Sequence, residues 1–275
     1  MPHIESSDEY VLGRDISGSI RLDAQHLLWR LHTGYTLHPA IPRSGNMKIA
    51  EVGTGTGVWL FDLAQELPDT VCLDGYDISA TQFPSQELYP PNVSLCLMDS
   101  LQDPPDSLLE QYDVVHLRMW ASNLRTKDVK ILICSVSKLL KPGGYIQWEE
   151  ANLLAQDVRS SISKEFERKA NELFTAADID YSWVSSLKAS LESCGMVSIE
   201  HLQRRFKPGL IQMCTNTYLM ALKEIFAGIK RTSSIRDSAE IKACDTLLDK
   251  LICSRDDGIV YNWGPVSSLA RKPSV

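Results

Sequence analysis

The stretch KIAEVGTGTGVWLFDLAQELP (residues 48–68) decides the fold, because glycines at positions 53, 55 and 57 join a short apolar run to an apolar-periodic one. MKIAEV has the composition of a buried strand, whereas VWLFDLAQEL has the spacing of a helix. A strand that feeds a helix through glycines creates a crevice at the carboxyl edge of a sheet, where a ligand can approach the backbone and the helix N-terminus. The stretch therefore predicts a strand–loop–helix unit that binds a nucleotide-like ligand.

The alternation of strands and helices continues along the chain. CLDGYDI, NVSLCLM, YDVVHLRM and YIQWEEA have the pattern of strands, and VKILICSVSKLL, before Lys141-Pro142-Gly143-Gly144, has the pattern of a helix. An earlier helix is expected over residues 19–33, with an apolar stripe of Leu22, Leu28, Trp29 and Leu31. This alternation predicts an α/β fold with a parallel sheet and helices on both faces.

The C-terminal part predicts further elements. Helices are expected over residues 163–177 and 184–194, a strand over Val197 to Phe206, and a helical stretch over 211–254. The extended segment GIVYNWGPVSSLARKP follows it. The chain contains no repeat and no low-complexity block, so we expect a continuous core.

Composition excludes several classes of partner. Lys and Arg number 28 against 35 Asp and Glu, and a net charge of -7 gives no electrostatic footprint for nucleic acid or for an anionic membrane. The seven cysteines are scattered without a CxxC pair or a nearby His at ligand spacing, so no metal site is predicted. The acidic first residues and the lack of a long apolar window predict a cytoplasmic protein.

The glycine loop and the acidic residues after it narrow the ligand. The loop reads GxGxG instead of the dinucleotide pattern GxGxxG, and Glu51 before it would repel a pyrophosphate but could pair with an ammonium. Asp77 lies 20 residues after Gly57, at a strand end where a carboxylate can accept hydrogen bonds from both ribose hydroxyls. Asp99 ends the third strand, where it could accept from an adenine amino group. These positions predict a nucleoside without a pyrophosphate.

The same segments resemble a known family. EVGTGTG, GYDIS, MDSL, YDVVHLR and KPGGYIQWEE are similar to the successive motifs of class I S-adenosylmethionine-dependent methyltransferases. LGRDISGSIRLDAQHLLW, HPAIP, ISATQFP and PNVSL resemble the methyltransferase-like proteins of fungal secondary metabolism, mainly over residues 10–152. The resemblance implies a Rossmann-like sheet of seven strands in the order 3-2-1-4-5-7-6, with an antiparallel last strand.

The resemblance also implies a division of the chain. Residues 1–45 would form an N-terminal helical cap, and residues 46–210 the Rossmann-like core that binds S-adenosylmethionine. Residues 211–254 would form a helical insertion that serves as a substrate lid, and residues 255–275 would supply the last strand of the core sheet.

S-adenosyl-L-methionine is the cofactor that the resemblance and the residues jointly predict. Arg118, near the end of its strand, opens on the crevice and could meet the cofactor carboxylate or the substrate, or form a salt bridge. By resemblance, Tyr10, Arg14, Arg21 and Gln25 close over the methionine end. The expected cofactor-binding residues are Tyr10, Arg21, Glu51, Gly53, Thr54, Gly55, Gly57, Asp77, Ile78, Asp99, Ser100, Leu101 and Arg118.

Three residues are candidates for a general base. His116 lies inside an apolar strand, where it is either a base or a core histidine bonded to backbone. Glu149 and Glu150 point to opposite faces of one strand, so only one can face a pocket; Glu150 is the candidate, with a salt bridge as the alternative. His26 shares the inward face of the first helix with Leu22 and Trp29.

The predicted function is transfer of a methyl group from S-adenosyl-L-methionine to an O, N or S atom of a small-molecule natural product. Such a displacement depends mainly on the alignment of the reactants, so no fixed catalytic signature is expected. Two alternatives stay open on the same fold. One is a cyclase or pericyclase that uses the bound cofactor without consuming it, and the other is a noncatalytic regulator. The sequence predicts no oligomeric state.

Overall fold

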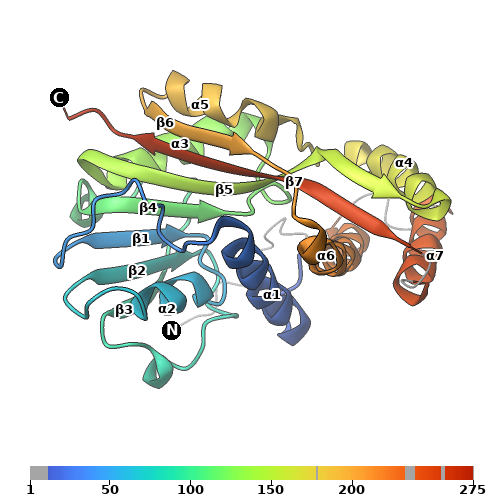
Figure 1. Cartoon of the computed structure of the whole chain (residues 1–275), viewed down its shortest axis with the longest axis horizontal. Helices are drawn as coiled ribbons and strands as arrows, with labels where there is room; N and C mark the ends of the chain where they lie inside the picture. Colours follow the sequence, from blue (N-terminus) through green and yellow to red (C-terminus); the bar gives the residue numbers. More distant parts are fainter. Residues whose placement is uncertain (1–11, 178, 233–238, 255–257, 275) are drawn as a thin grey trace.

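The computed structural model describes residues 12–177, 179–232, 239–254 and 258–274, and its centre is a seven-stranded sheet (Figure 1). The strand order is β3-β2-β1-β4-β5-β7-β6, and β7 runs antiparallel to both of its neighbours. The predicted fold class is therefore confirmed. The strands are β1 (Lys48–Val52), β2 (Cys72–Asp77), β3 (Val93–Leu97), β4 (Tyr112–Arg118), β5 (Leu140–Arg159), β6 (Val197–Gln203) and β7 (Val260–Arg271).

Helices cover both faces of the sheet and extend it at one end. In Figure 1, α1 and α2 lie in front of the sheet, α3 and α5 lie on the other side, and α4, α6 and α7 gather at one end. The helices are α1 (Ile16–Thr33), α2 (Val58–Ala64), α3 (Val129–Leu139), α4 (Ser161–Ala176), α5 (Leu187–Ser193), α6 (Ile211–Thr232) and α7 (Ala239–Cys253).

Helix α1 begins earlier than the sequence pattern predicts. Asp15 caps it, with a side-chain oxygen that accepts from the Gly18 amide at 2.9 Å, and Gly34 ends it in the left-handed conformation at φ 80°. Leu28 and Trp29 are buried as predicted, but Leu31 is 53% exposed, so its place in the inward stripe was wrong. The buried face of α1 is centred on Leu28 and Trp29, two to three residues before Leu31. The Leu31 side chain therefore points to the outer side of the helix.

Strand β5 is much longer than the predicted strand YIQWEEA. It spans Leu140–Arg159, and its far half pairs with the start of β7 after a register shift between Asn152 and Asp157. This paired ribbon carries the sheet outward to α4, α6 and α7, which Figure 1 shows beyond the end of β4. Helix α7 thus packs beside α4, a helix that comes before β6 in the chain, and α6 packs against α7.

The core is continuous from the sheet into these helices. One cluster of buried side chains includes Trp148 on β5, Phe166 on α4, Phe226 on α6 and Leu248 on α7. A second, smaller cluster packs α2 against β1 and β2. The extension therefore shares one hydrophobic core with the sheet. Within the described ranges, no helix is both long and apolar enough to cross a membrane.

Candidate functional site

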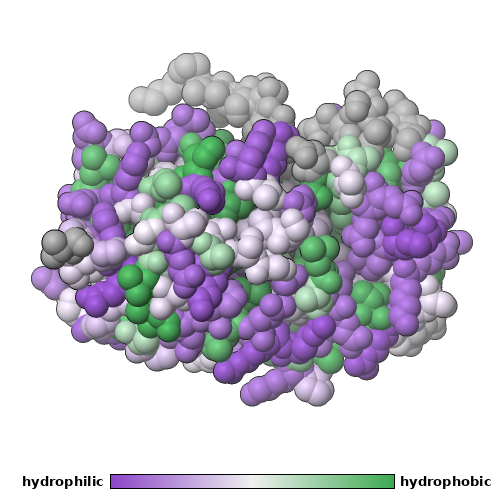
Figure 2. Space-filling model, turned by 90° about the horizontal axis from the view of Figure 1, so that it is seen from above, coloured by the Kyte–Doolittle hydropathy of each residue, from purple (hydrophilic) through white to green (hydrophobic). Residues whose placement is uncertain are grey.

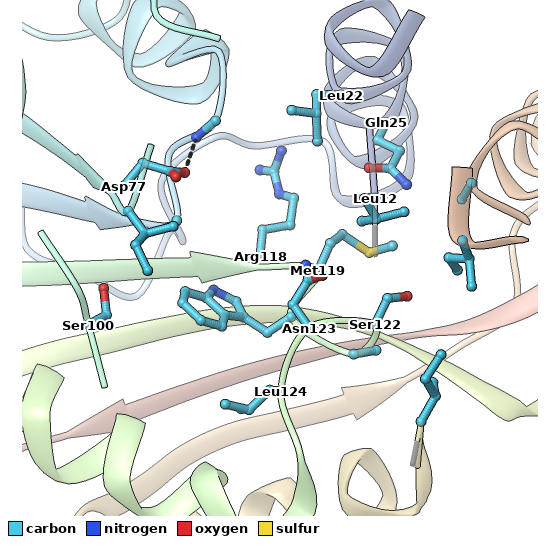
Figure 3. Close-up of a pocket in the computed structure, with 18 of the residues that line it drawn as sticks. Leu12, Leu22, Gln25, Asp77, Ser100, Arg118, Met119, Ser122, Asn123 and Leu124 are labelled. Atoms are coloured by element: carbon cyan, nitrogen blue, oxygen red, sulfur yellow. Dashed lines mark hydrogen bonds between the residues drawn. The ribbon is translucent and has the colours of Figure 1, made fainter. Parts of the chain in front are cut away.

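A cavity of about 450 Å³ opens where the carboxyl ends of β1, β2 and β4 meet (Figure 3). The sheet edge forms its floor, and α1 and the residues before it form one wall. The loop that follows β4 and one side of α6 form the remaining walls. The cavity therefore combines residues from α1, the sheet edge and α6.

The glycine loop is shaped for close approach. Gly53, Gly55 and Gly57 have φ of 74°, 56° and 75°, a region that side chains with a Cβ rarely adopt. A Cβ on Gly55 would lie 2.8 Å from the Leu22 side chain of α1, and one on Gly53 would lie 2.8 Å from the Trp120 ring. Gly53 and Gly55 line the cavity, whereas Gly57 precedes α2 as its N-cap.

Asp77 joins the loop to the end of β2, where the sequence places it. One carboxylate oxygen accepts from the Gly55 amide at 2.9 Å and the other accepts from the Ser79 amide at 3.1 Å (Figure 3). Burial raises the pKa of the Asp77 carboxyl, while these two hydrogen bonds and the charge of Arg14 oppose the increase. Both Asp77 and Arg14 line the cavity.

Glu51 and Thr54 lie behind the loop and do not line the cavity. The Thr54 hydroxyl donates to Glu51 at 2.6 Å, and the Thr54 amide donates to the Tyr76 carbonyl at 3.0 Å. Glu51 is 5% exposed and its other oxygen contacts His116. The structure thus places these two predicted cofactor ligands where they support the loop.

The segments that follow β3 and β2 contribute the other predicted positions. Asp99, Ser100, Leu101 and Ile78 all line the cavity. Asp99 accepts from the Leu101 amide at 3.0 Å, which forms a local turn. These residues and Asp77 line the same cavity, and their contact with a cofactor stays a prediction.

The Arg21 side chain is a buried cation in the cavity wall. Its Nε donates to Glu224 of α6 at 2.8 Å, and its Nη1 donates to Gln25 at 3.0 Å. The remaining Nη2 is buried and has no partner among the described residues, although the side chain lines the cavity. A buried donor without a partner is costly, so the cavity has a place for an acceptor group next to Arg21.

Arg118 also lines the cavity but is already paired. Its Nε donates to Glu149 at 2.7 Å and its Nη1 donates to Nδ1 of His26 at 3.0 Å. Because a guanidinium only donates, Nδ1 of His26 must be the acceptor, and its Nε2 donates to Asp62 at 2.8 Å. Burial and the charge of Arg118 lower the pKa of His26. His26 lies outside the cavity lining, and Tyr10 lies outside the described residues.

His116 is fully buried and has both ring nitrogens engaged. Nδ1 lies 3.1 Å from Glu51 and Nε2 lies 3.4 Å from Glu149, while Trp59 stacks on the ring at 3.8 Å. Both ring nitrogens therefore contact carboxylates inside the sheet, and the side chain does not line the cavity. This geometry favours the core-histidine alternative over the predicted base.

Glu149 and Glu150 point to opposite faces, as predicted, and neither lines the cavity. Burial alone would raise the pKa of Glu149, but Arg118 and His116 lower it to about 2. Glu150 accepts from the amides of Trp120 at 2.8 Å and Ala151 at 2.9 Å, and burial raises its pKa to about 7. Glu150 therefore holds the loop after β4 and does not contact the cavity.

One polar residue of the cavity wall was not predicted from the sequence. Tyr218 of α6 lines the cavity, among the apolar side chains of Leu153, Ile179 and Ile225. Its hydroxyl donates to Glu167 of α4 at 3.2 Å. The sequence does contain a local sign of this contact, because Glu167 lies next to Phe166 on the apolar face of an amphipathic helix, where a carboxylate is unusual.

Glu167 is an unusual carboxylate. It is 9% exposed, and Gln156 of β5 donates to its second oxygen at 2.9 Å. Burial raises its pKa to about 7, and the two hydrogen bonds oppose the increase. Near neutral pH this group can therefore exist with or without its proton. Among the residues that the structure describes, no cluster of three or more His, Cys, Asp or Glu is placed to hold a metal ion.

The fold and the cavity match what is known of one class of protein. A family model described as "Methyltransferase domain" matches residues 50–146, which include the glycine loop, Asp77, Asp99 and β4. Residues 50–146 are therefore similar to a methyltransferase domain, and the order of the strands agrees with the fold that the resemblance implies. "Methyltransferase grgD" of a Penicillium species is 36% identical over 161 residues, which are 56% of this chain and 55% of that protein. The chain spans about half the length of the curated relatives it matches.

Solved structures are similar over most of the chain. Phosphoethanolamine N-methyltransferase 2 of Haemonchus contortus, in complex with S-adenosyl-L-methionine, aligns with a TM-score of 0.50 and 13% identity, over 90% of this chain and 52% of that chain. The [4+2]-cyclase SpnF aligns with a TM-score of 0.51 and 14% identity, over 92% of this chain and 81% of that chain. At this level of identity the likeness shows the fold alone.

Proposed function

We propose that this protein transfers a methyl group from S-adenosyl-L-methionine to an O, N or S atom of a small-molecule natural product in fungal secondary metabolism. The observation that carries the proposal is the division of the cavity. Polar groups suited to a nucleoside and an amino acid lie at the sheet edge, and a mostly apolar chamber lies beyond them under α6. The family match and the similarity to a Penicillium methyltransferase support it.

The residues present fit this cofactor. Asp77 ends β2 with a carboxylate on the cavity wall, which suits the ribose hydroxyls. The unpartnered Nη2 of Arg21 suits the carboxylate of the methionine part, and Asp99 to Leu101 offer contacts for the adenine. When bound, S-adenosyl-L-methionine supplies a methyl group on a positively charged sulfur. We do not assign Arg118 to the cofactor carboxylate, because Glu149 already neutralises the charge of its guanidinium.

If the methyl acceptor is a hydroxyl or an amine, it loses a proton during the reaction, and another group must take up that proton. Tyr218 is a polar side chain next to Leu153, Ile179 and Ile225 in the cavity lining, and its hydroxyl donates to Glu167. We assign Tyr218 as the residue that hydrogen-bonds the acceptor, with Glu167 as the carboxylate that receives the proton through the phenol. The proton would move from the acceptor to Tyr218 and from Tyr218 to Glu167, which must be ionised to receive it.

Two measurements test the proposed function. Calorimetric titration with S-adenosyl-L-methionine and S-adenosyl-L-homocysteine should show micromolar binding of both. Mass spectrometry should then show a gain of one methyl mass, with stoichiometric S-adenosyl-L-homocysteine, in a panel of natural products that carry phenol, amine or thiol groups. Tyr218→Phe should slow methylation of phenols about 100-fold and leave cofactor binding unchanged.

The alternatives give different outcomes in the same experiment. A cyclase would produce an isomer of its substrate without S-adenosyl-L-homocysteine, and SpnF shows that this fold occurs in such an enzyme. A regulator would bind the cofactor and form a stable protein complex without a product. Failure to bind either cofactor would contradict the proposal and both of these alternatives as stated.

A further inference from the structure

The outer face of α1 carries a straight row of exposed apolar side chains. Ile16 is 76% exposed, Ile20 62%, Leu27 48% and Leu31 53%. Their spacings of four, seven and four residues place them on one side of the helix. We call these four side chains the α1 ridge. The opposite side of α1 contributes Arg21 and Gln25 to the cavity, so the ridge faces away from the site.

The α1 ridge contains four of the large apolar side chains that are exposed on the described surface. Figure 2 shows hydrophobic and hydrophilic side chains interspersed over the face that it presents. Other large exposed apolar residues, such as Leu88 and Leu154, are far apart in the sequence and are not part of such a row. Single exposed apolar residues are ordinary, whereas a continuous row marks an interaction surface.

We propose that two copies of this chain pair through the α1 ridge, with the two helices antiparallel about a two-fold axis. The spacing of the ridge is the same from either end, because positions 16 and 31, and positions 20 and 27, lie symmetrically about the point between residues 23 and 24. Antiparallel pairing therefore sets Ile16 against the partner's Leu31 and Ile20 against the partner's Leu27. A two-fold interface requires such a self-complementary surface.

Charges beside the ridge do not oppose this contact. Asp23 accepts a hydrogen bond from the Thr56 hydroxyl at 2.9 Å. Arg30 contacts Asp62 at 2.7 Å and Glu66 at 3.0 Å. Both charged side chains beside the ridge are thus engaged with their own chain. Pairing would bury apolar groups without leaving either charge without a partner.

The size of the α1 ridge determines how strongly we expect two copies of the chain to associate. A stable interface buries about 800 Å² on each partner, and one row of four side chains is narrower than that. We therefore expect a reversible dimer with a dissociation constant on the order of 10 μM. Because the inner side of α1 forms a wall of the cavity, the contact would also brace that wall. The inference rests on the fold and not on the proposed function.

Sedimentation equilibrium tests the dimer. The wild-type protein should change from monomer to dimer between about 1 and 100 μM. The double variant Ile20→Lys with Leu27→Lys should weaken association about 100-fold, because like charges would meet inside the contact. Leu88→Lys places the same charge on another exposed leucine and should leave association unchanged. A wild-type monomer over the whole concentration range would overturn the proposal.

A charge-pair variant tests the register. In Ile20→Lys with Leu27→Glu, antiparallel pairing brings each introduced lysine opposite an introduced glutamate of the partner, so association should recover at least 10-fold relative to the double lysine variant. Parallel pairing would set like charges opposite each other and give no recovery. Circular dichroism of each variant should match the wild type, which separates loss of association from loss of folding. Association that is indifferent to both double variants would place the interface elsewhere and contradict the proposal.

Discussion

At the scale of single residues, Asp77 has the clearest expected effect. Its two oxygens accept from the Gly55 and Ser79 amides while the side chain lines the cavity. Asp77→Ala should weaken S-adenosyl-L-methionine binding by about 1.5 to 3 kcal/mol, the usual contribution of hydrogen bonds to a charged group. Calorimetry measures the loss, and Asp103→Ala, at an exposed position outside the cavity, serves as the control. Unchanged affinity would restrict Asp77 to supporting the loop.

The residues whose place at the cavity follows from the sequence are those defined by a local pattern. Gly53, Gly55 and Asp77 follow from a strand–loop–helix motif and its distance to the next strand end. His116 could not be assigned in this way, because its partners Glu51 and Glu149 come from the strands on either side. Which role a buried histidine has depends on neighbours that only the sheet pairing brings together. The catalytic candidates were therefore the least predictable part of the site.

At the scale of elements, Glu150 links the end of β5 to the loop after β4. It accepts from the amides of Trp120 and Ala151 and from the Trp148 indole at 3.3 Å. Met119, directly before Trp120, has φ of 58° and lines the cavity. A non-glycine residue rarely adopts this conformation, so the surrounding contacts must hold it. Glu150 supplies one of those contacts from below the loop.

Glu150 also predicts a pH dependence of stability. Its pKa of about 7 in the folded protein lies above the usual value of 4.5, so folding favours the protonated form. The free energy of unfolding should therefore fall as pH rises from about 4.5 to 7, by about 3 kcal/mol from this residue. In Glu150→Gln this part of the fall should disappear. Urea unfolding at pH 4.5 and pH 8 measures the difference between wild type and variant.

Glu165→Gln is the matched control for this measurement, because Glu165 is exposed on α4 and pairs with Lys169. It should keep the pH dependence of the wild type. Glu167 also has a raised pKa, so some dependence should remain in Glu150→Gln. An identical fall in wild type and Glu150→Gln would mean that Glu150 is ionised in the folded protein throughout this range.

The order of the elements was predictable, but their ends were not. Alternation of strand and helix patterns predicts the β-α units, since each pattern is local. The far half of β5 has no such pattern, and residues 157–159 become a strand because β7 pairs with them. The Lys141-Pro142-Gly143-Gly144 sequence correctly predicted that α3 ends before it. In the structure these four residues belong to β5, which begins at Leu140. Long-range pairing decided both boundaries.

At the scale of the whole molecule, the cavity is closed by a contact between segments 203 residues apart. Arg21 of α1 and Glu224 of α6 form a buried ion pair at 2.8 Å, and Glu224 also accepts from the Gly13 amide at 3.0 Å. No pattern in the sequence predicts this pair, because each residue lies in a helix of ordinary composition. The pair joins the N-terminal helix to the insertion, the two parts that wall the cavity on either side.

Removing one partner of such a pair leaves the other charge buried and costs about 3 to 5 kcal/mol. In Glu224→Gln, α1 should therefore separate from α6 far more often, and amide hydrogen exchange in both helices should rise about 100-fold or more. Exchange in β4 and β5 should not change, because the sheet does not depend on this contact. Arg168→Gln, which breaks the exposed pair of Arg168 with Glu172, is the control and should alter neither helix. A uniform rise over the whole chain would show that the pair stabilises the entire fold, whereas no rise in α1 would show that the packing of Trp29 against Trp263 is enough to hold it.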